Sequence, residues 1–150
     1  MINNLYITKS IYNEICKSLE TNIYESGGIV GGDYCCNKVY DFIYDDEPIY
    51  STASSYFPNT KKLKTNMELN WNTKEIQFIG FVHSHINNSE ISVEDIEYAR
   101  TFLQSNSYYQ YILMGIAKMN LFHKVVKIDW YRVSLNDVSL MKLNFICKEE

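Results

Sequence analysis

Apolar and polar positions follow two different periods along the chain, and these periods predict both helices and strands. Apolar side chains recur at intervals of three and four residues in three segments, which predicts helices over 9–20, from Pro58, Asn59 or Thr60 to Trp71, and over Ser92–Ser105. Denser or alternating apolar runs predict strands over Leu5–Thr8, Gly28–Cys36, Lys38–Tyr44, Ile76–His83, Tyr109–Ala117, Lys124–Val133 and Val138–Ile146. The polar segment Asp45–Phe57 is predicted to be an irregular loop.

The order of these segments and the composition both indicate one globular domain. Strands and helices intermix, with hairpin-like pairs of strands at both ends, so we expect an α+β fold in which a mixed β-sheet is flanked by helices. A length of 150 residues suits a single domain over residues 1–150, and 46% apolar residues are enough to build a core.

Charge and terminal sequence narrow the range of partners. The formal net charge is -4, from 14 basic and 18 acidic residues, and the basic residues form no stripe, so we expect no nucleic-acid partner. The N-terminus has no basic segment followed by an apolar one, and no run approaches the roughly 18 apolar residues that span a bilayer. We therefore expect a cytoplasmic protein without a membrane partner.

The four cysteines, Cys16, Cys35, Cys36 and Cys147, match neither a Cys-x-x-Cys motif nor a zinc knuckle. In a reducing compartment they are expected to be free thiols, mostly packed as small apolar groups. A thiolate zinc site at Cys35 and Cys36 is the less favoured alternative.

Two of the three histidines close the most apolar of the predicted strands, in the sequence His83-Ser84-His85. Side chains two residues apart on a strand point to the same face, so both imidazoles can meet one metal ion. The alternative is a pair of polar residues where a strand ends in a loop. The third histidine, His123, opens a late strand and is expected at the surface.

A helix start follows closely after the two histidines. Ser92 with Asp95 three residues later is typical of a helix N-terminus, which needs no further function. The same geometry also places Asp95 as a third, anionic ligand, with Glu94 or Glu90 as alternatives. Three protein ligands and one water make up the open coordination of catalytic zinc.

A carboxylate lies upstream, where Glu25 precedes Gly27 and Gly28. The glycines allow close approach of the backbone, and a metal-activated water needs a nearby carboxylate to take its proton. Taken alone, Glu25 is better explained as a surface residue before a glycine turn.

Together these pieces resemble the JAB/MPN (JAMM) metalloprotease family over about residues 5–133. The matching motifs are Glu25-Ser26-Gly27-Gly28, His83-Ser84-His85 and Ser92-Val93-Glu94-Asp95. The resemblance implies that His83, His85 and Asp95 hold one zinc ion per chain, that Glu25 is the general base and that Ser92 donates a hydrogen bond to the oxyanion. It also implies the MPN fold, which is similar to that of cytidine deaminases.

The chain departs from the family pattern at two places. Ile86 stands where members usually have proline, and six residues, 86–91, separate the second histidine from Ser92 where members usually have seven. The exact placement of Ser92 and Asp95 is therefore the point that a structure must test.

The resemblance implies a zinc-dependent isopeptidase or peptidase that cleaves after the C-terminal tail of a ubiquitin-like modifier. As a small stand-alone domain, the chain resembles the bacterial members of the family, some of which accompany ubiquitin-like conjugation systems in antiphage defence. The same chemistry would serve a peptidase that acts on sulfur-carrier proteins with thiocarboxylate or cysteine adducts. A catalytically inactive MPN scaffold is the alternative from another functional class. The short segments 45–57 and 105–109 predict recognition of a modifier tail without selectivity for chain linkage.

Overall fold

A mixed β-sheet organises the molecule, for which the computed structural model describes residues 3–72, 75–86 and 90–146. Within these residues the strands are β1 (Asn4–Thr8), β2 (Gly27–Asp33), β3 (Lys38–Tyr44), β4 (Tyr50–Ser51), β5 (Tyr56–Phe57), β6 (Gln77–His85), β7 (Tyr111–Met119), β8 (Val125–Ser134), β9 (Val138–Leu140) and β10 (Lys142–Ile146). The helices are α1 (Lys9–Glu20), α2 (Thr60–Trp71) and α3 (Val93–Ser105). The predicted α+β class and the single domain agree with this arrangement.

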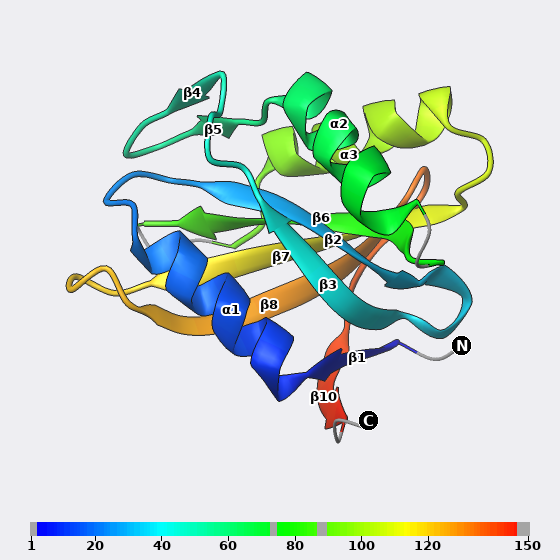
Figure 1. Ribbon diagram of the computed structural model, residues 1–150, viewed down its shortest axis with the longest axis horizontal. Coiled ribbons are helices and arrows are strands. Elements are labelled where there is room, and N and C mark those ends of the chain that lie inside the picture. The colour runs from blue at the N-terminus through cyan, green and yellow to red at the C-terminus, as the bar shows by residue number, and fades with distance from the viewer. Residues whose placement is uncertain (1–2, 73–74, 87–89, 147–150) are drawn as a thin grey trace.

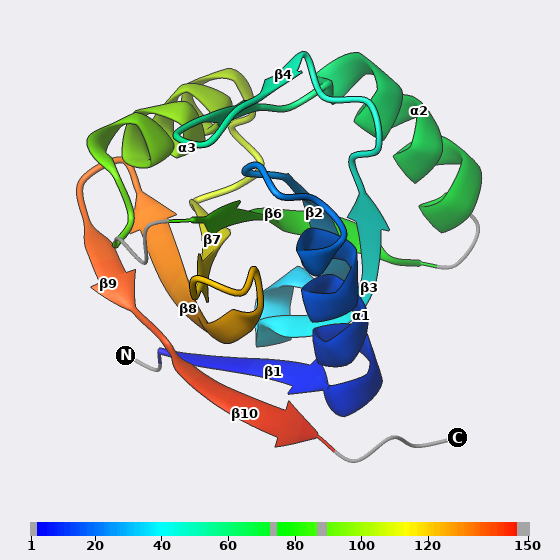
Figure 2. The same cartoon turned by 90° about the vertical axis from the view of Figure 1, so that its left-hand side faces the viewer.

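The described strands form an eight-stranded sheet in the order β10-β1-β3-β2-β6-β7-β8-β9, with β4 and β5 as a separate hairpin. The pairs β1–β10, β1–β3 and β6–β7 are parallel and the remaining pairs are antiparallel. Helix α1 lies against the concave face of this sheet, while α2 and α3 cover the opposite face (Figures 1 and 2).

Alternation along β7 explains why both faces of the sheet are covered. Leu113 and Ala117 belong to the core cluster that contains Ile15 of α1, whereas Ile112 and Ile116 pack in the cluster under α3. Successive side chains of a strand point to opposite faces, so a continuous apolar strand needs a helix on each side.

The predicted helices are confirmed, and the apolar side chains along one face of each helix are buried against the sheet. Ala99 and Leu103 of α3 pack over β7 and β8, while Leu63 and Trp71 of α2 are buried against Ile29 of β2. Burying the Leu63 and Leu103 side chains contributes roughly 1.5–3 kcal/mol each, which exceeds what helix propensity supplies.

The C-terminal segment closes the sheet on itself. β9 pairs with β8 at one edge, and β10 pairs in parallel with β1 at the other. Between them, Met141 N–H donates to the Trp130 carbonyl at 2.8 Å and Lys142 N–H donates to the Asn3 carbonyl at 2.7 Å. Figure 2 shows this segment running along the rim of the curled sheet. The single strand predicted over Val138–Ile146 is therefore two strands that bend at Met141.

Two other sequence predictions are wrong in detail. The strand predicted to reach Cys36 ends at Asp33, whose carboxylate accepts from Cys35 N–H at 3.1 Å and starts a short 3₁₀ turn. This turn ends at Asn37, which adopts a left-handed backbone with φ 55°. The predicted irregular loop Asp45–Phe57 contains the hairpin β4–β5.

The cysteines are less buried than predicted. Cys35 and Cys36 are exposed and Cys16 is half-buried, all three as free thiols, while Cys147 lies outside the described residues. None of the described helices has the length and apolar character needed to cross a membrane.

Candidate metal centre

A β-bulge in β6 sets the direction of the two histidines. Val30 of β2 pairs with Gly80, but the next residue, Gly31, pairs with Phe78, so Ile79 is an extra residue on β6. The bulge reverses the alternation, because Phe78 and Phe81 both pack in the apolar clusters on the side of α2 and α3. Bulges of this kind re-aim side chains next to functional sites.

The two histidines continue this row beyond Phe81. His83 and His85 are 9% and 5% exposed, and both side chains lie at the C-terminal end of β6. The His83 backbone pairs with Gly27, where the absence of a side chain lets the strands approach. The sequence prediction that the two imidazoles share one face is confirmed.

Asp95 is fixed by the start of α3. Ser92 is the N-cap residue, and its Oγ accepts from Asp95 N–H at 3.1 Å while Asp95 Oδ2 accepts from Ser92 N–H at 3.1 Å. This reciprocal capping box was predicted from the sequence. Ile91 and Ile96, at the positions of a hydrophobic staple, pack against the same apolar cluster and set the angle at which the chain enters the helix.

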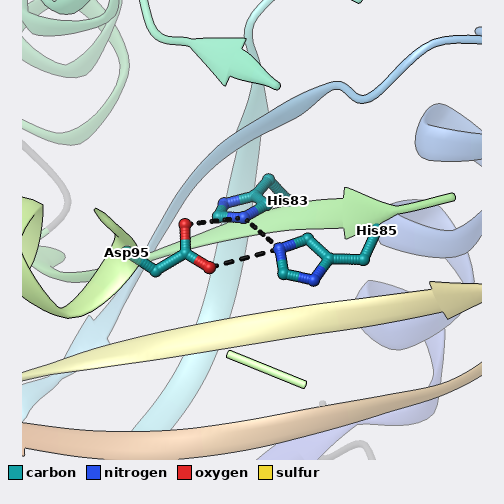
Figure 3. Close-up of side chains that lie close together, drawn as sticks. All are labelled: His83, His85 and Asp95. Carbon is teal, nitrogen blue, oxygen red and sulfur yellow. Dashed lines mark hydrogen bonds and ion pairs between the residues drawn. The ribbon is translucent and has the colours of Figure 1, made fainter. Parts of the chain in front are cut away.

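The three side chains converge on one point (Figure 3). His83 Nε2 and His85 Nε2 are 3.1 Å apart, His83 Nε2 lies 3.1 Å from Asp95 Oδ1, and His85 Nε2 lies 3.2 Å from Asp95 Oδ2. Among the described residues these three side chains form a group whose ligand atoms all lie within 4.8 Å of one another. Asp95 therefore lies beside both histidines although the sequence between His85 and Ser92 is one residue shorter than the family pattern.

This donor set fits a small divalent cation. Two imidazole nitrogens and a carboxylate point their lone pairs at one another. Shared protons or a cation must lie between these atoms to offset the electrostatic repulsion. Ligands at about 2.0 Å in a tetrahedron are about 3.3 Å apart, close to the observed separations. Nitrogen and oxygen donors of this kind suit zinc and other first-row transition metals.

The electrostatics favour an anionic Asp95. Burial alone would raise the pKa of its carboxyl group, but hydrogen bonds from His83 and His85, with the bond from the Ser92 backbone, hold that pKa well below its usual range. The group is thus charged at neutral pH, as a metal ligand must be.

Glu25 enters the site from the segment between α1 and β2. Its N–H donates to the Thr52 carbonyl at 2.9 Å, and its carbonyl accepts from Ser51 Oγ at 2.5 Å, so the β4–β5 hairpin holds its backbone. On the other side, Ser26 and Ser84 join this segment to β6: Ser26 N–H donates to Ser84 Oγ at 3.0 Å and Ser84 N–H donates to the Ser26 carbonyl at 2.9 Å.

The Glu25 side chain faces inward, contrary to the alternative of a surface glutamate. It is 7% exposed and lines the same cavity as His83 and His85. Burial raises the pKa of its carboxyl group above the usual value, although the charges of the two histidines act in the opposite direction. A carboxylate with a raised pKa is better suited to move protons near neutral pH.

A cavity of about 480 Å³ opens over these residues. The β4–β5 hairpin forms one wall of it with Tyr50, Tyr56 and Phe57. Tyr56 has its hydroxyl bonded to the buried Asp45 at 2.8 Å and its ring centroid 5.9 Å from that of His83. Sequence reasoning missed this wall, although the aromatic residues on either side of the short polar stretch 51–55 were a signal for a hairpin.

The alternative ligands lie elsewhere. Glu90 binds Lys118 and Tyr131, with its two carboxylate oxygens 2.7 and 2.6 Å from the partner atoms. Glu94 lines the cavity as an exposed residue outside the group of converging ligands. His123 is only partly exposed and lies in the turn before β8, contrary to the prediction that it opens the strand.

Comparison of the sequence with protein-family models and with curated proteins gives no match. Among solved structures, the chain is similar to protein DSY2949 from Desulfitobacterium hafniense, with a TM-score of 0.72 at 16% sequence identity. The similarity covers 97% of this chain and 94% of that one. At this level of identity the likeness concerns the fold alone.

Proposed function

We propose that the chain is a zinc-dependent peptidase of the JAB/MPN (JAMM) type, with the MPN fold. The observation that carries the proposal is the convergence of His83, His85 and Asp95 at the floor of a cavity that Glu25 and Ser92 also line. A mixed sheet with one helix on one face and two on the other supports the proposed fold.

Each residue has a role that its surroundings support. His83, His85 and Asp95 would hold zinc, which when bound lowers the pKa of a water molecule and polarises a carbonyl group. Glu25 takes a proton from the attacking water and passes it to the leaving amine. Its burial and raised pKa suit this exchange in both directions.

Ser92 stabilises the charge that develops on the scissile carbonyl oxygen. Its Oγ accepts from the Asp95 backbone, so the hydroxyl proton is directed away from that bond and can be donated within the cavity. A preorganised donor of this kind contributes about 2.7–4 kcal/mol to transition-state binding.

The substrate that we propose is the C-terminal tail of a ubiquitin-like protein, joined to a target or to a precursor extension. The cavity combines aromatic walls with the hydroxyl groups of Ser54 and Ser55, and the hairpin beside it offers a short strand for an extended peptide. A bacterial antiphage conjugation system is the proposed setting. Sulfur-carrier adducts are the second substrate class to test.

The test is cleavage of a panel of ubiquitin-like and sulfur-carrier fusions, with and without a chelator. We expect one zinc per chain and cleavage that the chelator abolishes. Glu25→Gln should lower the cleavage rate by about 10²–10⁴-fold while retaining zinc, because only the proton carrier is lost. Glu68→Gln, which removes an exposed carboxylate on α2, is the matched control. A wild-type protein that stays metal-free in zinc-replete buffer would refute the proposal.

A further inference from the structure

A buried lysine marks the place where the sheet meets the start of α3. Lys118 extends the apolar row of Ile112, Met114 and Ile116 on the α3 side of β7, and it is 6% exposed. Its Nζ lies 2.7 Å from Glu90 Oε2 and 3.1 Å from Asp129 Oδ2. A buried ammonium group is strongly unfavourable without a partner, and these two carboxylates balance its charge.

Glu90 is bound a second time by the sheet. Tyr131 on β8 donates its hydroxyl to Glu90 Oε1 at 2.6 Å, so both carboxylate oxygens have a partner. The Lys118 hydrogen bond, followed by that of Tyr131, lowers the pKa of Glu90 below its usual value. Although the Glu90 side chain is 70% exposed, it is therefore tied to two neighbouring strands.

This attachment lies on the path between the candidate ligands. Glu90 precedes the N-cap residue Ser92 by two positions, and the capping box fixes the Asp95 carboxylate relative to Ser92. On the sheet, Lys118 pairs in register with His85. His85 is thus connected to Asp95 in three steps. Its backbone pairs with Lys118, the Lys118 side chain binds Glu90, and Glu90 leads through Ser92 to Asp95.

We infer that Glu90, Lys118 and Tyr131 are positioning residues, which hold the start of α3 so that Asp95 meets His83 and His85. The inference rests on the proposed function, because it assigns these contacts to a metal site. It also explains how Asp95 meets the histidines although only six residues separate His85 from Ser92 in the sequence. A salt bridge two residues before the N-cap determines where the helix begins relative to β7.

The experiment measures metal binding and needs no substrate. Zn²⁺ and Co²⁺ are titrated into the full chain against a competing chelator, and the visible absorption of bound Co²⁺ reports the geometry of its ligands. Glu90→Gln and Lys118→Met should weaken binding about tenfold or more and alter the Co²⁺ spectrum, as losses of supporting contacts around metal sites do. Tyr131→Phe should show a smaller effect in the same direction.

Two matched controls test whether the effect comes from the lost contact or merely from the change in net charge. Glu97→Gln removes an exposed carboxylate from α3, and Lys64→Met removes an exposed ammonium from α2; both should bind Co²⁺ as the wild type does. Because Lys118→Met changes a buried residue, the exposed Glu90→Gln variant carries the test if the former does not fold.

Variants that lose thermal stability but keep the wild-type Co²⁺ affinity and spectrum would overturn the inference and leave Glu90 a purely structural role. A wild type that binds no metal would overturn it together with the proposed function. If the variants weaken metal binding while the wild type cleaves no fusion, the positioning role stands and the peptidase proposal fails.

Discussion

The substitution Asp95→Asn separates the two roles of this carboxylate, which are to cap the start of α3 and to bind the metal ion. Asn at this position keeps a side-chain oxygen that can accept from Ser92 N–H, so the capping box survives, and the loss of a negative charge at the helix N-terminus costs about 0.3–1 kcal/mol. It loses the negative charge that lies 3.1 and 3.2 Å from the two imidazole nitrogens. The loss should therefore appear in metal binding more than in the helix.

The size of the expected effect on stability follows from the linkage between zinc binding and folding. Zinc at 100 times its Kd raises the free energy of unfolding by about 2.7 kcal/mol. If removal of the anionic ligand weakens affinity by about 100-fold, the same free zinc concentration adds only about 0.4 kcal/mol. The zinc-dependent increment is the quantity to compare, because a change in the stability of the zinc-free variant cancels from it.

The assay is urea unfolding at a buffered zinc concentration and again with a chelator. Asp137→Asn, in an exposed turn, is the control for the same chemical change and should keep the full increment. An Asp95→Asn protein that also keeps the full increment would refute the assignment of Asp95 as a ligand. A wild type without any increment would refute the site as a whole.

Two further predictions follow from packing and exposure. Gly27→Ala would place a Cβ 2.7 Å from His83 Cβ, so we expect a loss of about 1–3 kcal/mol in urea unfolding and weaker zinc binding; unchanged stability would contradict the close approach. At pH 8, iodoacetamide should label the exposed Cys35 and Cys36 before Cys16, because burial raises the pKa of Cys16 to about 11 and leaves about one thiolate in a thousand. Peptide mass mapping measures the order, and equal labelling rates in the folded protein would contradict it.

Local patterns predicted the parts of the site that depend on local geometry. The spacing of His83 and His85 determines a shared strand face, and Ser92 with Asp95 specifies a helix start, so both could be recognised in the sequence. The burial of Glu25 depends on hydrogen bonds to Ser51 and Thr52, which the sequence did not indicate.

Features that arise from long-range pairing could not be predicted. The bulge at Ile79 exists only in the register between β2 and β6. The contacts of Glu90 with Lys118 and Tyr131 join positions 28 and 41 residues apart, and no periodicity within a segment reports them. The bend at Met141 likewise results from the two sheet edges that it connects.

The link between the two edges has a consequence for biosynthesis. β1 emerges from the ribosome before every other described strand, whereas its partner β10 is made after all of them. Pairing between such distant segments slows folding, and until it forms, β1 presents unpaired backbone groups to neighbouring chains. Completion of the sheet must therefore follow synthesis of residues 142–146. We expect nascent chains that stop before this segment to depend on chaperones to stay free of aggregation.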